Sequence, residues 1–388
     1  GNNLKLTTNI NDINSFIALV NNGVSINGIV NALQQSGGAL KTNGNLVFIS
    51  PNGMVVGTSG VINVGNLSVI SPTQSSYDKL SSNLGLPKDH QYYISRYHVS
   101  YDASNPEATS TINPTEYDYT MNTAVMTDKS FDLSTLTDSA GSTLSLGGKA
   151  IQIDAGGRVA ARGDINLQGG TIANNGLLLA GIGNNKTTAL TGHDAADELF
   201  NALVSQDNMT SANTFVNNNG NISIKSVTGT SVGKDAKVRN YGTGNITIEN
   251  TGANGISIAG EVSNPNGATK ITNTNGGLLV ASTGLIASGG SALTQNKSTL
   301  LVSNEGSGGM NIQGKVTANH TNKTNTVNFV NKNSNMSIGS SDKNNNITSN
   351  ADVNIAVTNG NLLNNGVANT LIYTTNGADL NATVKNGA

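Results

Sequence analysis

The 388-residue chain contains no Cys and no Trp, and proline, aromatic and charged residues are all scarce. The absence of Cys excludes disulfides and thiol chemistry. Aromatic residues are only 4% of the chain, which argues against a large globular core, and charged residues only 11%, which argues against ordinary disorder. A formal net charge of −2 provides no electrostatic basis for binding nucleic acid. No apolar run approaches the ~18 residues of a transmembrane helix.

The chain is instead rich in Gly, Asn and short β-branched runs, which are clearest between Asn43 and Leu67. Three runs of this stretch are bounded by turn-forming residues: Leu46–Ile49, Met54–Val56 and Val61–Val64. Strands this short do not suit a β-sandwich, whose turns are about 8–12 residues apart. They are typical of a chain that winds in coils and stacks each strand on the previous turn. We therefore predict an all-β fold, a right-handed parallel β-helix.

Similar units recur to the end of the chain, and each has the form aliphatic-x-aliphatic after Gly or Asn. The units begin at residues 220, 244, 276, 308 and 334, with steps of 24, 32, 32 and 26 residues. In such a unit two aliphatic side chains face inward and the polar residue between them faces outward. We assign residues 129–388 to the β-helix.

The other segments lack this pattern. Residues 1–70 are expected to form an N-terminal cap and the motif coils. In this region Asp12 to Val20 fits a helix or a buried strand, and the apolar spacing from Ile26 to Gln34 predicts a short helix. Residues 71–128 hold seven of the nine tyrosines and four of the six prolines, which indicates an extra-helical insertion with a strand within Gln91 to Ser100. Capping residues and one apolar face predict a short flanking helix near 194–206.

Catalytic and ligand-binding residues are few. The best candidates for a charged cluster are Lys149, Asp154, Arg158, Arg162 and Asp164, which we interpret as a solvated coil face rather than a catalytic pair. Arg162-Gly163-Asp164 is also an integrin-type tripeptide, but Gly163 is better explained as a corner. The four His show no zinc-type spacing, so we expect no metal site. Carboxylates and aromatic residues are too few to build sugar-binding subsites, so we expect no cofactor and no enzyme activity.

The tyrosine-rich insertion is the one part whose composition suggests recognition, since Tyr offers a rigid contact surface with a hydrogen-bonding tip. A mini-core within the insertion is the simpler interpretation. The candidate ligand contacts are Tyr92, Tyr93, Tyr97 and Tyr101.

The stretch NGNLVFISPNGMVVG followed by VINVGNLSVIS resembles the N-terminal secretion domain of filamentous-haemagglutinin-type exoproteins of two-partner secretion. That family reads N-G-x, an apolar run, N-P-N-G, a second run ending in F-G, and then V-N-V-G-x-L. This chain departs from the pattern at Ser50 and Val56, where the family has Asn and an aromatic residue. The match to the family pattern also includes Val64 and Leu67. The predicted secretion motif comprises Asn43, Gly44, Asn45, Pro51, Asn52, Gly53, Gly57, Asn63 and Gly65.

The resemblance implies the secretion and folding domain of a large surface adhesin. Its partners would be an outer-membrane transporter, which recognises the motif, and a host receptor or glycan of unknown identity. The protein would be secreted to the surface of a cell with a Gram-negative-type envelope, and we expect a monomer. The alternatives are a passive β-helical stalk of an adhesin and a carbohydrate-active β-helix enzyme.

Overall fold

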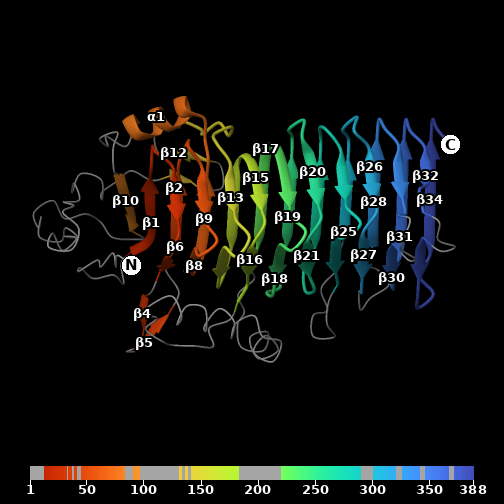
Figure 1. Cartoon of the computed structure of the whole chain (residues 1–388), viewed down its shortest axis with the longest axis horizontal. Coiled ribbons are helices and arrows are strands. Elements are labelled where there is room, and N and C mark those ends of the chain that lie inside the picture. The colour runs from red at the N-terminus through yellow and green to blue at the C-terminus, as the bar shows by residue number, and fades with distance from the viewer. Residues whose placement is uncertain are drawn as a thin grey trace, which may run out of the picture.

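The fold, seen in a computed structural model, is a single stack of coils along one axis. The described residues are 13–32, 34–36, 39–41, 45–83, 91–96, 131–132, 136–138, 141–182, 220–289, 300–319, 326–340, 346–366 and 371–388. Within them the coils follow one another from the N-terminal end to the C-terminal end of Figure 1. The strands pair in parallel with those of the turn before, which confirms the predicted parallel β-helix.

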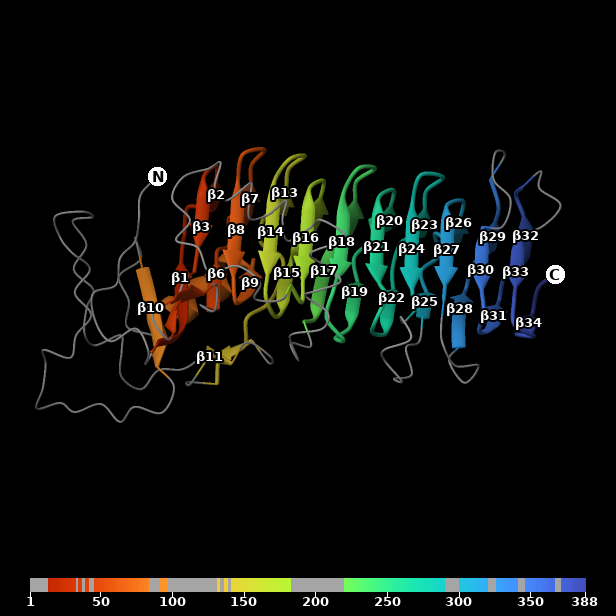
Figure 2. The same ribbon diagram turned by 90° about the horizontal axis from the view of Figure 1, so that it is seen from below.

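Each complete turn supplies three short strands, which define three faces. Faces A and B belong to the 20-stranded sheet, and face C is the 10-stranded sheet. Face A contains β1 (Ile13–Leu19), β6 (Asn45–Ile49), β9 (Asn66–Ile70), β15 (Ile165–Asn174), β17 (Ile222–Val232), β19 (Ile246–Asn250), β22 (Thr269–Asn273), β25 (Leu300–Asn304), β28 (Thr326–Lys332), β31 (Asp352–Thr358) and β34 (Leu380–Lys385). Face B contains β2 (Val24–Ile26), β7 (Met54–Val56), β13 (Ile151–Ile153), the second halves of β15 and β17, β20 (Gly255–Ile258), β23 (Leu278–Val280), β26 (Met310–Ile312), β29 (Met336–Ile338) and β32 (Leu362–Asn364). Face C, labelled from β3 to β33 in Figure 2, contains β3 (Ile29–Asn31), β8 (Val61–Val64), β14 (Arg158–Ala161), β16 (Leu177–Ala180), β18 (Lys237–Asn240), β21 (Glu261–Asn264), β24 (Leu285–Ser288), β27 (Lys315–Ala318), β30 (Ile347–Ser349) and β33 (Ile372–Thr374).

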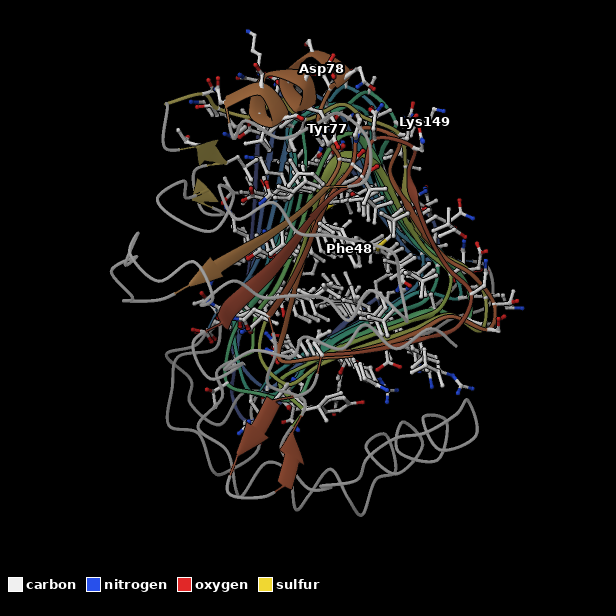
Figure 3. The ribbon with its side chains drawn as sticks, turned by 90° about the vertical axis from the view of Figure 1, so that its left-hand side faces the viewer. Phe48, Tyr77, Asp78 and Lys149 are labelled. Carbon is white, nitrogen blue, oxygen red and sulfur yellow. The ribbon has the colours of Figure 1, made fainter. Side chains whose placement is uncertain are left out.

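The core follows from the alternation of side chains along each strand. In β19, Ile246 and Ile248 are fully buried, whereas Thr247 and Glu249 between and after them are partly exposed. Since parallel strands are in register, Ile246 lies between Ile222 of the previous turn and Thr269 of the next. The inward aliphatic residues of successive turns form one continuous cluster. Figure 3, viewed along the stack, shows them filling the cross-section, with Phe48 among them.

A second layer covers the outside of the N-terminal coils. The helix α1 (Gln74–Asn83) packs on face A through Tyr77 and Leu80, which join Ile49 and Ile70 in a separate apolar cluster. Figure 3 shows Tyr77 on the side of α1 that faces the coils. Because Tyr77 packs against the coils, its hydrophobic surface stabilises the β-helix rather than a core within the insertion.

The edge of the first turn is also covered. The strand β10 (Gln91–Arg96) pairs antiparallel with β1, so a strand from the tyrosine-rich region closes the face A edge. The predicted strand in Gln91 to Ser100 is confirmed over these six residues. Two short hairpins lie beside the coils: β4 (Gln34–Ser36) with β5 (Ala39–Lys41), and β11 (Phe131–Asp132) with β12 (Thr137–Asp138).

The helix predicted between Ile26 and Gln34 is wrong, because this segment holds the end of β2, the whole of β3 and the start of β4. The helical spacing arises where one inward strand ends at Ile26 and the next begins at Ile29 after a two-residue corner. Val30 then faces the core in register with Ile62. The ambiguous segment from Asp12 is a strand, β1.

The recurring aliphatic units identified in the sequence lie on two different faces of the β-helix. The units at residues 220 and 244 lie in β17 and β19 on face A, and the other three lie in β23, β26 and β29 on face B. The helix predicted at 194–206 lies outside the described residues. In the part of the chain that is described, no helix has the length and apolarity needed to cross a membrane.

Candidate functional site

The predicted secretion motif occupies one turn of the β-helix, β6–β7–β8, together with its corners. The first corner is Ser50 to Gly53, where the Gly53 N–H donates to the Ser50 carbonyl over 3.1 Å. Gly53 has φ of +75°, and a Cβ there would lie 2.1 Å from the Ala150 carbonyl oxygen. Both the left-handed backbone and the lack of space for a side chain explain why glycine is needed.

Pro51 and Asn52 connect this corner to both neighbouring turns. The Pro51 carbonyl accepts from the Lys149 N–H over 2.9 Å, on the C-terminal side. Asn52 Nδ2 donates to the Asn21 carbonyl over 2.6 Å, on the N-terminal side. The corner therefore ties three successive turns together.

Gly57 begins the second corner, between β7 and β8. Its N–H donates to the Ile26 carbonyl over 2.9 Å, and a Cβ would lie 2.0 Å from Asn27 Oδ1. Gly60 closes the turn by donating to the Gly57 carbonyl over 2.8 Å. This corner therefore lies directly against the Ile26 carbonyl and the Asn27 side chain of the previous turn.

The third corner contains Gly65 and joins face C to face A. The Gly65 carbonyl accepts from the Gly163 N–H over 2.7 Å, which locks the corner to the next turn. On face C beside it, Asn63 is 2% exposed and donates through Nδ2 to Asn31 Oδ1 over 3.0 Å.

Asn45, which opens β6 and pairs with Asn66 of the next turn, starts an exposed ladder that passes through the third corner. Asn66 Nδ2 donates to Asn45 Oδ1 over 2.6 Å, and Asn66 Oδ1 accepts from the Asp164 N–H over 2.6 Å. The ladder continues because an Asp164 carboxylate oxygen accepts from the Asn221 N–H, and Asn221 Oδ1 from the Asn245 N–H. These side chains cap the backbone that immediately precedes β15, β17 and β19 on face A.

The motif residues therefore share one turn but do not converge on one surface. Pro51, Gly53, Gly57, Asn63 and Gly65 are buried, and Asn52 is partly exposed. Asn43 and Gly44 lie outside the described residues. In the folded protein these residues hold turns together, and little of them is open to a partner.

The tyrosine candidates are only partly placed. Tyr92 and Tyr93 lie in β10, opposite Ala18 and Ile17 of β1. Tyr97 and Tyr101 lie outside the described residues. The backbone that carries Tyr92 and Tyr93 therefore serves as the antiparallel cover of β1.

The charged candidates do not assemble into a catalytic pair. Asp154 and Asp164 lie in the corners that precede and follow β14, so a whole strand separates them. The Asp164 carboxylate already accepts the backbone N–H and the side-chain amide of Asn221, over 2.6 and 3.1 Å. A Cβ at Gly163 would lie 2.3 Å from Asn66 Oδ1, so the tripeptide forms a tight corner and not a projecting loop. Burial lowers the pKa of the Arg162 guanidinium.

One ion pair stands out on face C. Arg239 Nε and Nη2 donate to the two carboxylate oxygens of Glu261, over 2.7 and 2.6 Å. Arg239 Nη1 also contacts the Tyr241 hydroxyl at 3.4 Å. Burial raises the pKa of Tyr241, and its contact with the guanidinium offsets part of that rise. The pair joins adjacent turns, and no group of three or more His, Asp or Glu able to hold a metal lies beside it or elsewhere in the described ranges.

Sequence reasoning missed a buried ladder at the end of the face A strands, here called the internal ladder. Asn250 Nδ2 donates to Asn273 Oδ1 over 2.7 Å, and Asn273 Nδ2 donates to Asn304 Oδ1 over 2.8 Å. Asn304 continues to Asn331 over 2.9 Å, and Ser226 precedes Asn250 at 2.8 Å. The members are 24, 23, 31 and 27 residues apart. The available signal was a polar residue two positions after the inward aliphatic pair, as in ITIEN.

Comparison with family models, with curated proteins and with solved structures finds no match for this chain.

Proposed function

We propose that this chain is the secretion and folding domain of a large surface adhesin, exported through a dedicated outer-membrane transporter. The proposal rests on the resemblance of residues 43–67 to the secretion motif of two-partner secretion. It is supported by the position of that motif in the first turns of a β-helix whose face A edge is closed by β10.

The burial of the motif residues bears on the stage of export at which a transporter would recognise them. Gly53, Gly57 and Gly65 are buried and make contacts between turns, so a transporter cannot reach them in the folded protein. Recognition would therefore take place on the extended chain before it folds. An extended segment can pair its backbone with the strand edge of a partner, which is β-augmentation.

Folding outside the cell then gives the same residues a second role. Once β6, β7 and β8 form, each presents a free edge to the next strand of its face, as the parallel pairs β6–β9, β7–β13 and β8–β14 illustrate. Coils would add in order from the N-terminal end, because each new coil finds its template already in place. Folded coils cannot return through a transporter that carries extended chain, so folding makes export directional.

The test compares two Asn-Gly corners with the same geometry. Gly53 has φ of +75° and Gly276 has φ of +74°, and a Cβ at either would lie 2.1 or 2.3 Å from a carbonyl oxygen of a neighbouring turn. We would replace Asn52 and Gly53 by Ala in one variant and Asn275 and Gly276 by Ala in the other. Each variant is co-expressed with the cognate transporter, sought in the neighbouring gene, and secreted protein is measured.

If the transporter recognises the motif, the 52–53 variant should lose export. The 275–276 variant should be exported at a higher level than the 52–53 variant. A peptide of residues 43–67 should also bind the periplasmic domains of the transporter, whereas the folded chain should not. Equal export of both variants, or binding by the folded chain alone, contradicts the proposal.

A passive stalk is the second candidate for the coils after residue 220. Their outer surface is built from repeated amide contacts, such as Asn354 Nδ2 to Asn328 Oδ1 at 3.1 Å and Asn381 Nδ2 to Asn354 Oδ1 at 3.2 Å. Such ladders stiffen a rod without forming a concave site. We propose a non-enzymatic role in either case, since Asp154 and Asp164 are a strand apart. Binding of the chain to host cells or to a glycan array would favour an adhesin, and the absence of binding would favour a stalk.

A further inference from the structure

The corner between β22 and β23 contains an Asn-Gly pair with an unusual contact. The Gly276 N–H donates to Oδ1 of Asn275, the residue directly before it, over 2.9 Å. Asn275 is exposed, so water reaches its side chain. The contact therefore joins a backbone nitrogen to the side-chain amide of its own neighbour.

This contact places a nucleophile beside an electrophilic carbon. An N–H can only donate, so the amide atom that faces Gly276 is the oxygen and not Nδ2. Cγ is one bond beyond that oxygen, and glycine has no side chain to hinder its approach. A small rotation of the amide then turns the face of Cγ toward the Gly276 nitrogen, which is a near-attack arrangement.

The neighbouring turns hold the pair in this arrangement. The Thr274 N–H donates to the Asn250 carbonyl of the previous turn over 2.9 Å. The Gly276 carbonyl accepts from the Gly308 N–H of the next turn, also over 2.9 Å. Because the backbone is fixed on both sides of Asn275, little conformational freedom remains to be lost before the two groups react.

Two other Asn-Gly pairs lie at the same corner of other turns and lack this contact. Asn254 is exposed, but the Gly255 N–H donates to the Gly252 carbonyl over 3.2 Å. Asn359, which precedes Gly360, is exposed too, but its Nδ2 donates to Asn333 Oδ1 over 3.2 Å. Attack at either pair must first break a hydrogen bond, whereas the contact at Asn275 already joins the reacting groups.

We propose that Asn275 is a site of spontaneous deamidation, at which the backbone of this chain converts an amide to a carboxylate. The Gly276 nitrogen gives its proton to hydroxide and forms a bond to Cγ of Asn275. The Cγ–Nδ2 bond breaks, and ammonia leaves with a proton taken from water, which produces a five-membered cyclic imide. Water then opens the imide at either carbonyl. Opening at Cγ yields aspartate, and opening at the main-chain carbonyl yields isoaspartate.

The isoaspartate product would alter the stack at this corner. Its backbone runs through the former side chain and is one carbon longer, so the Gly276 carbonyl is displaced from the Gly308 N–H. Either product also adds a negative charge at an exposed position. The proposal is independent of the secretion role, because it uses only the corner that follows β22.

The first experiment follows deamidation by peptide mapping of the 388-residue chain, incubated folded at mildly alkaline pH and analysed by mass spectrometry. Conversion at Asn275 should be about tenfold faster than at Asn254 or Asn359, because each of those sites must first lose a hydrogen bond. Both aspartate and isoaspartate should appear at position 275. Equal rates at the three sites, or aspartate as the sole product, would overturn the proposal.

The second experiment traps the cyclic imide. Hydroxylamine cleaves the chain at such an imide, so the wild-type protein should yield two fragments that meet between Asn275 and Gly276. Asn275→Gln would require a six-membered ring and should abolish this cleavage, with unchanged far-UV circular dichroism because the side chain is exposed. The matched control Asn254→Gln should leave cleavage after Asn275 unchanged. A wild-type chain that stays intact there, or equal cleavage of Asn275→Gln, contradicts the mechanism.

Discussion

Replacing Asn273 by Ala tests whether the internal ladder stabilises the β-helix. Asn273 is fully buried, accepts from Asn250 Nδ2 over 2.7 Å and donates to Asn304 Oδ1 over 2.8 Å. The Ala variant removes both contacts and leaves one N–H of Asn250 and the Oδ1 of Asn304 without their partner. Water cannot replace Asn273 easily, because all three side chains are fully buried.

The expected loss of stability follows from the two orphaned groups. Each buried polar group left without a partner costs about 1–3 kcal/mol, so the variant should be destabilised by about 2–6 kcal/mol. The matched control is Asn354→Ala on the outer surface, where Asn354 Nδ2 donates to Asn328 Oδ1 over 3.1 Å. Water can solvate the groups exposed there, so the control should lose less than about 1 kcal/mol.

The assay is guanidinium denaturation followed by far-UV circular dichroism, with hydrogen exchange to locate the loss. Coils of a solenoid contact only their neighbours, so exchange should increase most in the turns that contain β19, β22 and β25. The double variant Asn273→Ala with Asn304→Ala should cost less than the sum of the single variants, because both variants disrupt the same contact. If Asn273→Ala were no more destabilising than Asn354→Ala, or if the two buried variants were additive, the ladder would not act as a buried network.

Three further predictions concern a corner, the core and one tyrosine. Gly53→Ala should destabilise the chain by about 1–3 kcal/mol because of its positive φ and the absence of space for a Cβ, whereas Gly28→Ala, with no atom within 4 Å of its Cβ, should be neutral in the same thermal melt. Phe329→Ala should lower the denaturation midpoint by the equivalent of about 3–5 kcal/mol, because its side chain is fully buried in the inward cluster. The raised pKa of Tyr241 means that the unfolded chain loses this proton first, so stability is complete below about pH 10 and falls as the pH rises toward the folded-state pKa. Tyr241→Phe should therefore reduce the loss of stability measured by denaturation between neutral and alkaline pH, and an unchanged pH profile would contradict this.

The architecture could be predicted from the sequence because a β-helix depends on local patterns. Aliphatic residues two apart, followed by Gly or Asn, specify both the inward face of a strand and the corner that ends it. The strands β6, β7 and β8 were accordingly predicted to within one residue. The helix predicted between Ile26 and Gln34 was wrong because the pattern is local. Two short strands joined by a two-residue corner place apolar residues at the same spacing as one face of a helix.

Only the tertiary structure determines which face each strand joins and which residues of successive turns are in contact. The 276 unit follows the 244 unit in sequence but lies on another face, because each turn holds three strands of similar pattern and loops of different length separate them. Asn273 and Asn304 are 31 residues apart, and only the register between β22 and β25 brings them within hydrogen-bonding distance. The burial of the secretion motif likewise depends on the turns on both sides of it, whose contacts with Pro51 and Gly53 no local pattern specifies.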